Sequence, residues 1–320
     1  MTSLRMLVLR LVLLVLLALV ALPAFPAELG DPAPPLKIVK WIKGGPVDLA
    51  ARVGQGPTVV DFWATWNGQC KKTIPHLTEL QKKYQEKGVV FVGISKESPA
   101  VVEPFVAQMG AQMEYAVAVD DQQGTDAAYM KAFKQESIPH AFIVGPKGDI
   151  LWHGHPAAGG LEPALDRILA GTYDVEQGRK AIRATEAMRG YFQRLVQGRD
   201  DEETRAIGAG IVADGASDPA LMNEFAWTVL TEPQVKTRDL DLAMKAAQAA
   251  LDGSQSKDAA IMDTYARALF DTGRVAEAIE HQKKAVELAT DEALRKELEA
   301  ALKTYEEKAK ADAGAGEGGK

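Results

Sequence analysis

Apolar positions follow two different patterns along the chain, and the change between them divides it. From about residue 57 to residue 172, short apolar and β-branched runs alternate with longer amphipathic stretches, which predicts strands separated by helices. From residue 173 onward no strand pattern recurs, and alanine-rich amphipathic stretches follow one another instead. We therefore predict an α/β domain at 28–172 and an all-helical domain at 173–309, followed by a glycine-rich, disordered tail at 310–320.

The α/β domain is predicted to hold a mixed sheet with helices on both faces. Its last two strands flank Gly145-Pro146-Lys147-Gly148-Asp149, a sequence typical of a hairpin connection. A proline-rich lead at 31–35 is expected to be extended, because proline lacks an N–H and restrains its neighbour. Strands are expected at 58–64, 89–95, 115–119, 141–144 and 150–152, and helices at 67–87, 99–109, 125–133 and 161–170.

The helical domain carries a repeated pattern of small and large residues that resembles tetratricopeptide repeats. Extra residues near Glu232-Pro233 lengthen the turn of the earlier unit. A helical bundle without repeat geometry is the alternative. A repeat scaffold of this kind implies a protein partner for this region. The two units consist of Met222, Phe225, Ala226, Val229, Ala243 and Ala250, and of Met262, Tyr265, Ala266, Leu269, Gly273, Ala278 and Ala285.

The first residues have the order of an export signal. Arg5 and Arg10 precede an apolar run at 11–22, which is followed by a proline- and alanine-containing exit at 23–27. Residues 1–27 are therefore predicted to be a signal peptide or an N-terminal anchor, since the apolar run is short for a membrane span. We expect an exported protein of the bacterial periplasm or cell envelope that touches the membrane only through such an anchor.

Charge and cysteine content narrow the possible chemistry. The formal net charge of −7 argues against a nucleic-acid partner, which requires a basic face. Cys70 is the only cysteine, so the chain has no internal disulfide. An exported protein with one thiol either buries that thiol or uses it.

Two motifs together resemble the thioredoxin-like superfamily. The first runs from Val59 to Pro75 and contains Trp66-Asn67-Gly68-Gln69-Cys70, with a proline five residues after the cysteine. The second is Ser137-Ile138-Pro139-His140, ahead of an apolar strand. The sequence over 29–172 is most similar to exported TlpA/ResA-like thiol–disulfide oxidoreductases and the related redoxin (AhpC/TSA) group. This resemblance implies a thioredoxin-like α/β fold with a cis Pro139 and no cofactor.

The resemblance also implies residue roles, and one residue departs from it. Family members attack a disulfide with a first cysteine, where this chain has Asn67, and resolve the product with a second, where it has Cys70. Asparagine is a good helix N-cap, so the replacement keeps the helix and removes the nucleophile. In the family the residue at Asp61 lies buried behind the second cysteine and acts as its base. Cys70 is then either a reactive lone thiol, with Asp61 as its base, or a small buried residue that is inert.

Other interpretations of these residues are weaker. A peroxiredoxin-like site would have proline at Trp63 and threonine at Asn67. His140 either lies near Cys70 and lowers its pKa or is a polar residue on the rim of the site. Trp152-His153-Gly154-His155 places two histidines on one face of a strand, but no third ligand is near in sequence, so no metal site is predicted.

The backbone of Ile138, with Trp66, Asn67, Pro139 and His140, forms a predicted groove for an extended polypeptide or a thiol protein. Two functions follow from these features. One is an exported thioredoxin-like redox protein with at most monothiol chemistry through Cys70. The alternative is a redox-inactive thioredoxin fold joined to a repeat scaffold, with both parts binding proteins.

Overall fold

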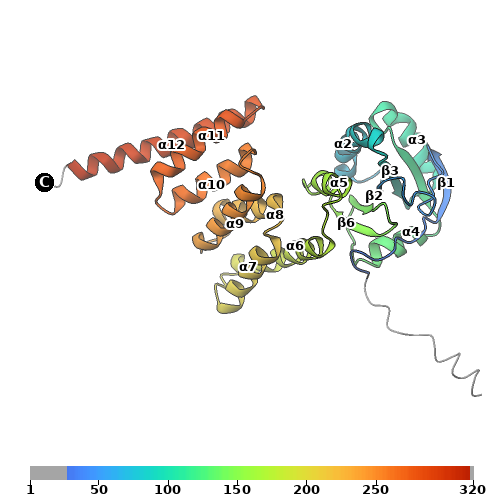
Figure 1. The fold of residues 1–320 in the computed structure, drawn as a ribbon, viewed down its shortest axis with the longest axis horizontal. Coiled ribbons are helices and arrows are strands. Elements are labelled where there is room, and N and C mark those ends of the chain that lie inside the picture. The colour runs from blue at the N-terminus through green and yellow to red at the C-terminus, as the bar shows by residue number, and fades with distance from the viewer. Residues whose placement is uncertain (1–26, 318–320) are drawn as a thin grey trace, which may run out of the picture. The chain divides into compact units, whose positions relative to one another are not determined.

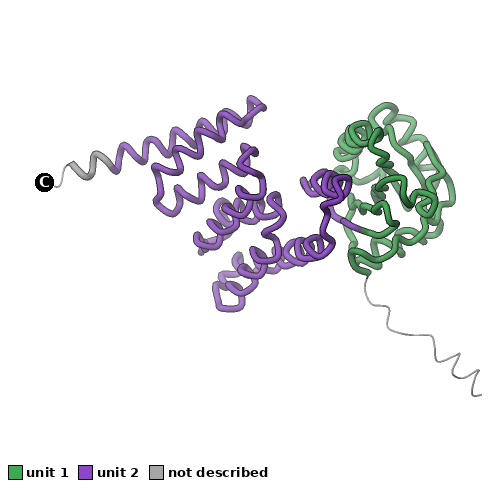
Figure 2. The backbone as a smooth tube through the Cα atoms, viewed as in Figure 1, with its two compact units in different colours: residues 1–150 green, residues 151–320 purple. Residues whose placement is uncertain are grey.

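The structure, a computed structural model, describes residues 27–317 (Figure 1). It separates into two compact units, residues 1–150 and 151–320 (Figure 2). The division falls inside strand β6 (Ile150–Gly154), so this grouping places the last strand and the helix after it with the helical region. The domain boundary after residue 172 stays a prediction from sequence.

The first unit is built on a mixed sheet with the strand order β1-β4-β3-β2-β5-β6. Strand β2 runs parallel to β3 and antiparallel to β5, and β3 runs parallel to β4. This confirms the predicted mixed sheet, whose β2 strand is buried along its whole length. The strands are β1 (Ile38–Lys43), β2 (Thr58–Trp63), β3 (Val90–Ser95), β4 (Ala116–Asp120), β5 (His140–Val144) and β6 (Ile150–Gly154).

Strand β1 was not predicted from the sequence. It pairs antiparallel with β4 at the edge of the sheet, and its register shifts twice over six residues. Its side chains are exposed or half-buried, and they include two lysines, as is common on edge strands. Lysines interrupt its apolar run and none of its residues is buried, so it differs from the buried strands of the same sheet.

Helices cover both faces of this sheet. Neighbouring residues on a strand point to opposite faces. The Trp63 ring lies 5.3 Å from that of Phe105 in α3, and the Phe62 ring lies 6.0 Å from that of Tyr129. The segment predicted as one helix at 125–133 is instead a short α-helical turn, α4, followed by a π-helical turn. The helical elements are α2 (Gly68–Tyr84) with a 3₁₀ turn at Gln85–Lys87, α3 (Pro99–Met109) with a 3₁₀ turn at Gly110–Gln112, α4 (Gly124–Asp126) with the π turn Ala127–Lys131, and α5 (Leu161–Leu169).

Beyond α5 the described chain is wholly helical, as predicted. Consecutive helices pack as pairs, α6 with α7, α8 with α9 and α10 with α11, and α12 packs on α11. Five of these helices begin at an aspartate whose side chain accepts from backbone N–H groups of the first turn. The helices are α6 (Val175–Val196), α7 (Glu202–Gly215), α8 (Pro219–Thr231), α9 (Leu240–Gly253), α10 (Ala259–Asp271), α11 (Val275–Leu288) and α12 (Glu292–Glu317).

Small residues line the core of the helical unit. The connection after α8 runs from 232 to 239, whereas that after α10 runs only from 272 to 274. The extra length near Glu232-Pro233 is thus a longer loop between paired helices. The absence of bulk at the small positions lets paired helices approach closely. Six alanines at repeat positions are completely buried, namely Ala226, Ala243, Ala250, Ala266, Ala278 and Ala285.

The two ends of the chain differ in how much of each the structure describes. The signal peptide or anchor predicted at 1–27 lies outside the described residues except for Ala27. Within residues 27–317 we find no helix with the length and apolar character needed to cross a membrane. At the other end, the predicted disorder from residue 310 is wrong for the described part, because α12 continues to Glu317. Alanines, together with an ion pair between Lys308 and Asp312 one turn apart, favour the helix there.

Candidate active site

The turn between β2 and α2 is organised by Asn67. Its backbone is extended, with φ −83° and ψ 116°, and its Oδ1 accepts hydrogen bonds from the N–H groups of Gln69 (2.8 Å) and Cys70 (3.1 Å). These two donors belong to the first turn of α2 and would otherwise have no partner. The predicted N-cap is therefore confirmed.

The other end of the Asn67 amide reaches a distant loop. Its Nδ2 donates to the carbonyl oxygen of Ile138 at 3.0 Å, and the Ile138–Pro139 bond is cis, as the resemblance implied. One side chain thus joins the start of α2 to the loop before β5. Sequence reasoning missed this bond, because nothing in the local pattern of either segment indicates it.

A carboxylate also fixes the turn from the side of β3. Glu97 accepts from the backbone N–H of Thr65 at 2.6 Å and from its hydroxyl at 2.7 Å. The Ser95 hydroxyl donates to the same carboxylate at 3.2 Å. Charged acceptors make the stronger class of hydrogen bond, so Thr65 has little freedom. Glu97 was also missed, since an acidic residue after a strand gives no specific signal.

Cys70 lies at the start of α2 with none of its surface exposed to solvent. Burial raises the pKa of the Cys70 thiol to about 11, and the nearby carboxyls of Asp61 and Glu97 add to that rise. Hydrogen bonding at the backbone of Ala64 acts in the opposite direction and is outweighed. A thiol that is both inaccessible and protonated is a poor nucleophile.

Asp61 is buried in the middle of β2, as the resemblance implied, with 1% of its surface exposed. Neither of its carboxyl oxygens has a hydrogen-bond partner within the described structure. Burial raises the pKa of Asp61 to about 8, so it is mostly neutral at pH 7. The Asp61 carboxyl also raises the pKa of the Cys70 thiol, so these two predicted site residues lie close together.

Two further polar atoms lie close to Asp61. Trp63 and Asp61 point to the same face of β2, and Gly93 of β3 pairs directly with Asp61. A Cβ on Gly93 would lie 3.0 Å from Trp63 Nε1 and from Tyr115 Cε2, so both rings fill the space beside Gly93. Among described residues, Trp63 Nε1 and the Tyr115 hydroxyl have no hydrogen-bond partner. Asp61 thus stands in a small buried group of unpaired polar atoms.

The surface of the site is formed by Trp66 and the loop at Ile138–Pro139. Trp66 is 71% exposed, Ile138 is half-buried and Pro139 is buried. The bond from Asn67 to the Ile138 carbonyl places this loop next to the tryptophan-bearing turn. The exposed indole of Trp66 therefore lies next to the bend at Ile138–Pro139.

His140 is not the polar rim residue that one interpretation expected. His140 is only 7% exposed, and its ring packs 5.2 Å from that of Phe142. It pairs with Phe62, so it lies on the face opposite Asp61 and cannot be a polar residue on the rim. His140 is buried because the strand β5 begins at this residue.

His153 is partly buried on β6, and burial lowers its pKa to about 4. No group of three or more metal-ligating side chains occurs within residues 27–312. The ionisable groups beside the turn are the Cys70 thiol and the carboxyls of Asp61 and Glu97.

Comparison with known proteins identifies the family of the first part of the chain. The sequence model of the AhpC/TSA family matches residues 29–153. The thiol-disulfide oxidoreductase ResA of Bacillus thuringiensis (strain Al Hakam) is 30% identical over 125 residues, which cover 39% of this chain and 68% of that protein. The chain belongs to the TlpA/ResA-like thioredoxin superfamily. Protein FixW of Rhizobium leguminosarum is a further relative, 28% identical over 45% of this chain and 67% of its own length.

Solved structures align with the same half of this ResA-like protein. A Chlorobium tepidum protein assigned as the thiol:disulfide interchange protein DsbE is 25% identical, covering 46% of this chain and 99% of that one, with a TM-score of 0.38. The thioredoxin domain of a thiol-disulfide oxidoreductase of Bacteroides vulgatus is 20% identical, covering 43% and 99%, with a TM-score of 0.37. The mixed sheet with flanking helices is a thioredoxin fold.

Proposed function

We propose that this thioredoxin-fold protein does not exchange disulfides and that it binds extended polypeptide beside Trp66 and Pro139. The observation that carries the proposal is the state of the turn. Asn67, which has no thiol, occupies the attacking position, and the single remaining thiol at Cys70 is fully buried with a pKa raised to about 11.

Disulfide exchange begins with a thiolate that can reach a sulfur atom of the substrate. With a pKa of about 11, only about one Cys70 in ten thousand is ionised at pH 7. The amide of Asn67 has no ionised form that attacks sulfur, and it is already committed to three hydrogen bonds. The first step of the family's reaction therefore has no group to perform it.

Binding does not need that step. An extended peptide can pair with exposed backbone and place apolar side chains against neighbouring surfaces. The Ile138 carbonyl keeps a second lone pair beyond the one that Asn67 uses. Trp66 offers a large apolar face at the same place. We propose that both contribute to a shallow groove for unfolded or flexible segments.

We further propose that the helical region is a tetratricopeptide-like scaffold that binds a protein partner. The helix pairs, their buried alanines and the short connection at 272–274 support this. The charged and apolar sequence at 1–27 supports export to the periplasm or cell envelope. Cell fractionation with N-terminal sequencing of the mature protein tests export and separates a cleaved signal from an anchor.

A second candidate function is monothiol chemistry, and Asp61 is the observation that favours it. A carboxyl without hydrogen-bond partners and with a pKa of about 8 can take up or release a proton near neutral pH. If an opening of the turn exposed Cys70, its proton would pass to Asp61 in the fraction of molecules where this carboxyl is ionised, and its sulfur would attack a partner's disulfide. A mixed disulfide would form while the partner's own S–S bond breaks, leaving the partner's second sulfur as a thiolate.

Alkylation of Cys70 in the native protein separates the two candidates. We expect a rate no faster than that of unfolding between about pH 5 and 10, because the thiol is buried and protonated. A reaction that follows an apparent pKa below the free value of roughly 8.5 would instead support the monothiol function. The variant Asn67→Cys serves as the positive control, since it should gain activity in an insulin-reduction assay that the unaltered chain lacks.

Polypeptide binding is tested with a permanently unfolded probe, reduced and carboxymethylated α-lactalbumin. We expect Trp66→Ala to weaken its binding several-fold, because a large exposed indole is removed. Val39→Ala is the matched control, since Val39 is also an exposed apolar residue but lies on the edge strand β1. Equal affinities for the two variants would contradict a groove at Trp66.

A further inference from the structure

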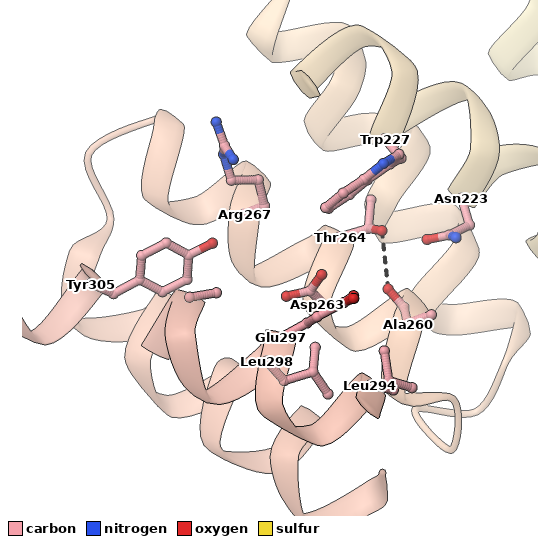
Figure 3. Close-up of a pocket in the computed structure, with 11 residues that line it drawn as sticks. Asn223, Trp227, Ala260, Asp263, Thr264, Arg267, Leu294, Glu297, Leu298 and Tyr305 are labelled. Carbon is pink, nitrogen blue, oxygen red and sulfur yellow. Dashed lines mark hydrogen bonds between the residues drawn. The ribbon is translucent and has the colours of Figure 1, made fainter. Parts of the chain in front are cut away.

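Three helices of the helical region enclose a pocket of about 320 Å³ (Figure 3). Residues of α8, α10 and α12 line it, and all of them belong to the second unit. Its volume is at the lower end of the range for ligand pockets, about 300–1,000 Å³. It suits a side chain with its flanking backbone better than a large cofactor.

A fixed carboxyl occupies the centre of this pocket. Asp263 is half-buried, and its Oδ1 accepts a hydrogen bond of 2.7 Å from Nε2 of Gln282. The same Nε2 donates to the carbonyl of Leu298 in α12 at 3.1 Å. Because Gln282 is itself fully buried, it holds the Asp263 carboxyl in one orientation. No described residue donates a hydrogen bond to the other oxygen, Oδ2.

The charges around Asp263 are mainly negative. Glu297 of α12 also lines the pocket, and it has no ion-pair partner among the described residues. Burial raises the pKa of Asp263, the Gln282 bond and Arg267 lower it, and Glu297 raises it, so Glu297 is close enough to act on it. Arg267 lines the pocket but pairs with Asp271 at 2.9 Å. An anionic ligand would therefore meet repulsion here.

The remaining polar and aromatic groups match a cation. Trp227 is 41% exposed, and its ring borders the pocket, while the Tyr305 hydroxyl points into it (Figure 3). The Asn223 Oδ1 is buried and has no hydrogen-bond partner in the described chain. Lone-pair acceptors together with an indole face form the environment that guanidinium and ammonium groups prefer.

We propose that this pocket binds an arginine or lysine side chain from an extended segment of a partner protein. The cationic head would donate to Asp263 Oδ2, Glu297 and Asn223 Oδ1, and its aliphatic stem would lie along Trp227. This inference rests on the proposed role of the helical region as a protein-binding scaffold, and it adds the chemistry of the residue recognised.

The experiment uses the full chain labelled with 5-fluorotryptophan and observed by ¹⁹F NMR. The chain has five tryptophans, and the variant Trp227→Phe assigns the resonance of Trp227. The probe is the peptide acetyl-Gly-Ser-Arg-Ser-Gly-amide. Matched peptides carry citrulline or glutamate in place of arginine. We expect the arginine peptide to shift the Trp227 resonance saturably and the citrulline peptide to bind at least about tenfold more weakly.

Variants of the two carboxyls then test the site itself. Asp263→Asn combined with Glu297→Gln should weaken the arginine peptide by about tenfold or more, since both changes remove charge and keep shape. Glu299→Gln is the control, because Glu299 is an exposed residue of α12 that does not line the pocket. Circular dichroism and thermal unfolding verify that each variant is folded.

Two results would overturn the proposal in different ways. Equal or tighter binding of the glutamate peptide at Trp227 would refute a cation site while leaving a scaffold that binds peptides. No shift of the Trp227 resonance with any of the three peptides or with the unfolded lactalbumin probe would count against both the pocket and the scaffold. The Trp66 resonance reports binding at the thioredoxin groove in the same samples.

Discussion

At the scale of single residues, Asn67 uses both ends of its amide. Its Oδ1 satisfies two N–H groups at the start of α2, and its Nδ2 donates to the Ile138 carbonyl. A cysteine at this position would lack the amide donor. The asparagine therefore stabilises the turn and joins it to the loop at Pro139 while removing the reactive thiol. Substitutions at this residue can separate the two contributions.

We expect Asn67→Ala to lower the free energy of unfolding by about 1–2 kcal/mol through the lost cap and by up to about 1 kcal/mol through the lost bond to Ile138. Asn67→Asp keeps the capping oxygen and adds a charge that is favourable at a helix N-terminus, so it should lose less. Urea unfolding monitored by circular dichroism measures both. An aspartate variant as unstable as the alanine variant would show that capping is not the main role of Asn67.

Asp61 makes stability depend on pH. Its folded-state pKa of about 8 lies above the ordinary value of 3.8, so the folded protein holds this proton more tightly than the unfolded chain does. The free energy of unfolding therefore falls as pH rises from about 4 to 8, by up to about 1.4 kcal/mol per pH unit. Asp61→Asn, which cannot ionise, should lack this decline.

Urea unfolding at pH 5 and pH 8 tests the prediction. From pH 5 to pH 8, the free energy of unfolding of Asp61→Asn minus that of the unaltered chain should increase by up to about 4 kcal/mol. Asp121→Asn, which changes an exposed carboxyl on the same domain, should show no such gain. Parallel pH profiles for the unaltered chain and Asp61→Asn would mean that Asp61 is ionised in the folded protein.

At the scale of elements, the close packing of β2, β3 and the ring of Tyr115 depends on Gly93. A methyl group there would lie 3.0 Å from Trp63 Nε1 and from Tyr115 Cε2, and both rings are buried. Contacts this short require the rings or the strand to move. The absence of a side chain at Gly93 thus leaves room for the rings of Trp63 and Tyr115 beside Asp61.

We expect Gly93→Ala to destabilise the protein by about 1–3 kcal/mol through overpacking. Gly68→Ala is a matched control, since a methyl group on Gly68 meets nothing within 4 Å at the first residue of α2. It should be neutral or stabilising by up to about 1 kcal/mol, because alanine favours helix. Thermal unfolding of both variants measures the difference, and equal melting temperatures would argue against tight packing at Gly93.

The elements that sequence predicted are those with a clear apolar pattern or a clear capping residue. Strand β2 is mostly apolar and buried along its length, and α2 begins at a residue with a strong capping preference, so both were recognised. Strand β1 was missed, because two lysines interrupt its apolar run and none of its residues is buried. The bonds from Asn67 to Ile138 and from Glu97 to Thr65 were missed for another reason: they join segments that only the folded sheet brings together.

At the scale of the whole molecule, the change in hydrophobic pattern along the sequence predicted two domains. It did not predict the residue at which the contacts within the chain separate into two units. The structure groups residues after 150 with the helical unit, whereas the sequence predicts a boundary after 172. Strand β6 nevertheless belongs to the sheet, where it lies beside β5. Residues Gly30 and Asp31 also hydrogen-bond to Ile150, the first residue of β6. Gly30 N–H donates to the Ile150 carbonyl at 2.7 Å, and Ile150 N–H donates to the Asp31 carbonyl at 2.9 Å.

Because β6 pairs with β5 and its first residue bonds to Gly30 and Asp31, we can predict which fragment of the chain folds. Residues 28–172 retain all of β6 and should unfold in a single cooperative urea transition. Residues 28–150 retain only its first residue, so β5 becomes an edge strand and the sheet loses one of its six strands. We expect this shorter fragment to unfold at a clearly lower urea concentration or without a cooperative transition. Because the two fragments differ only beyond residue 150, equal midpoints would place the boundary at the contact division and refute the one predicted from sequence.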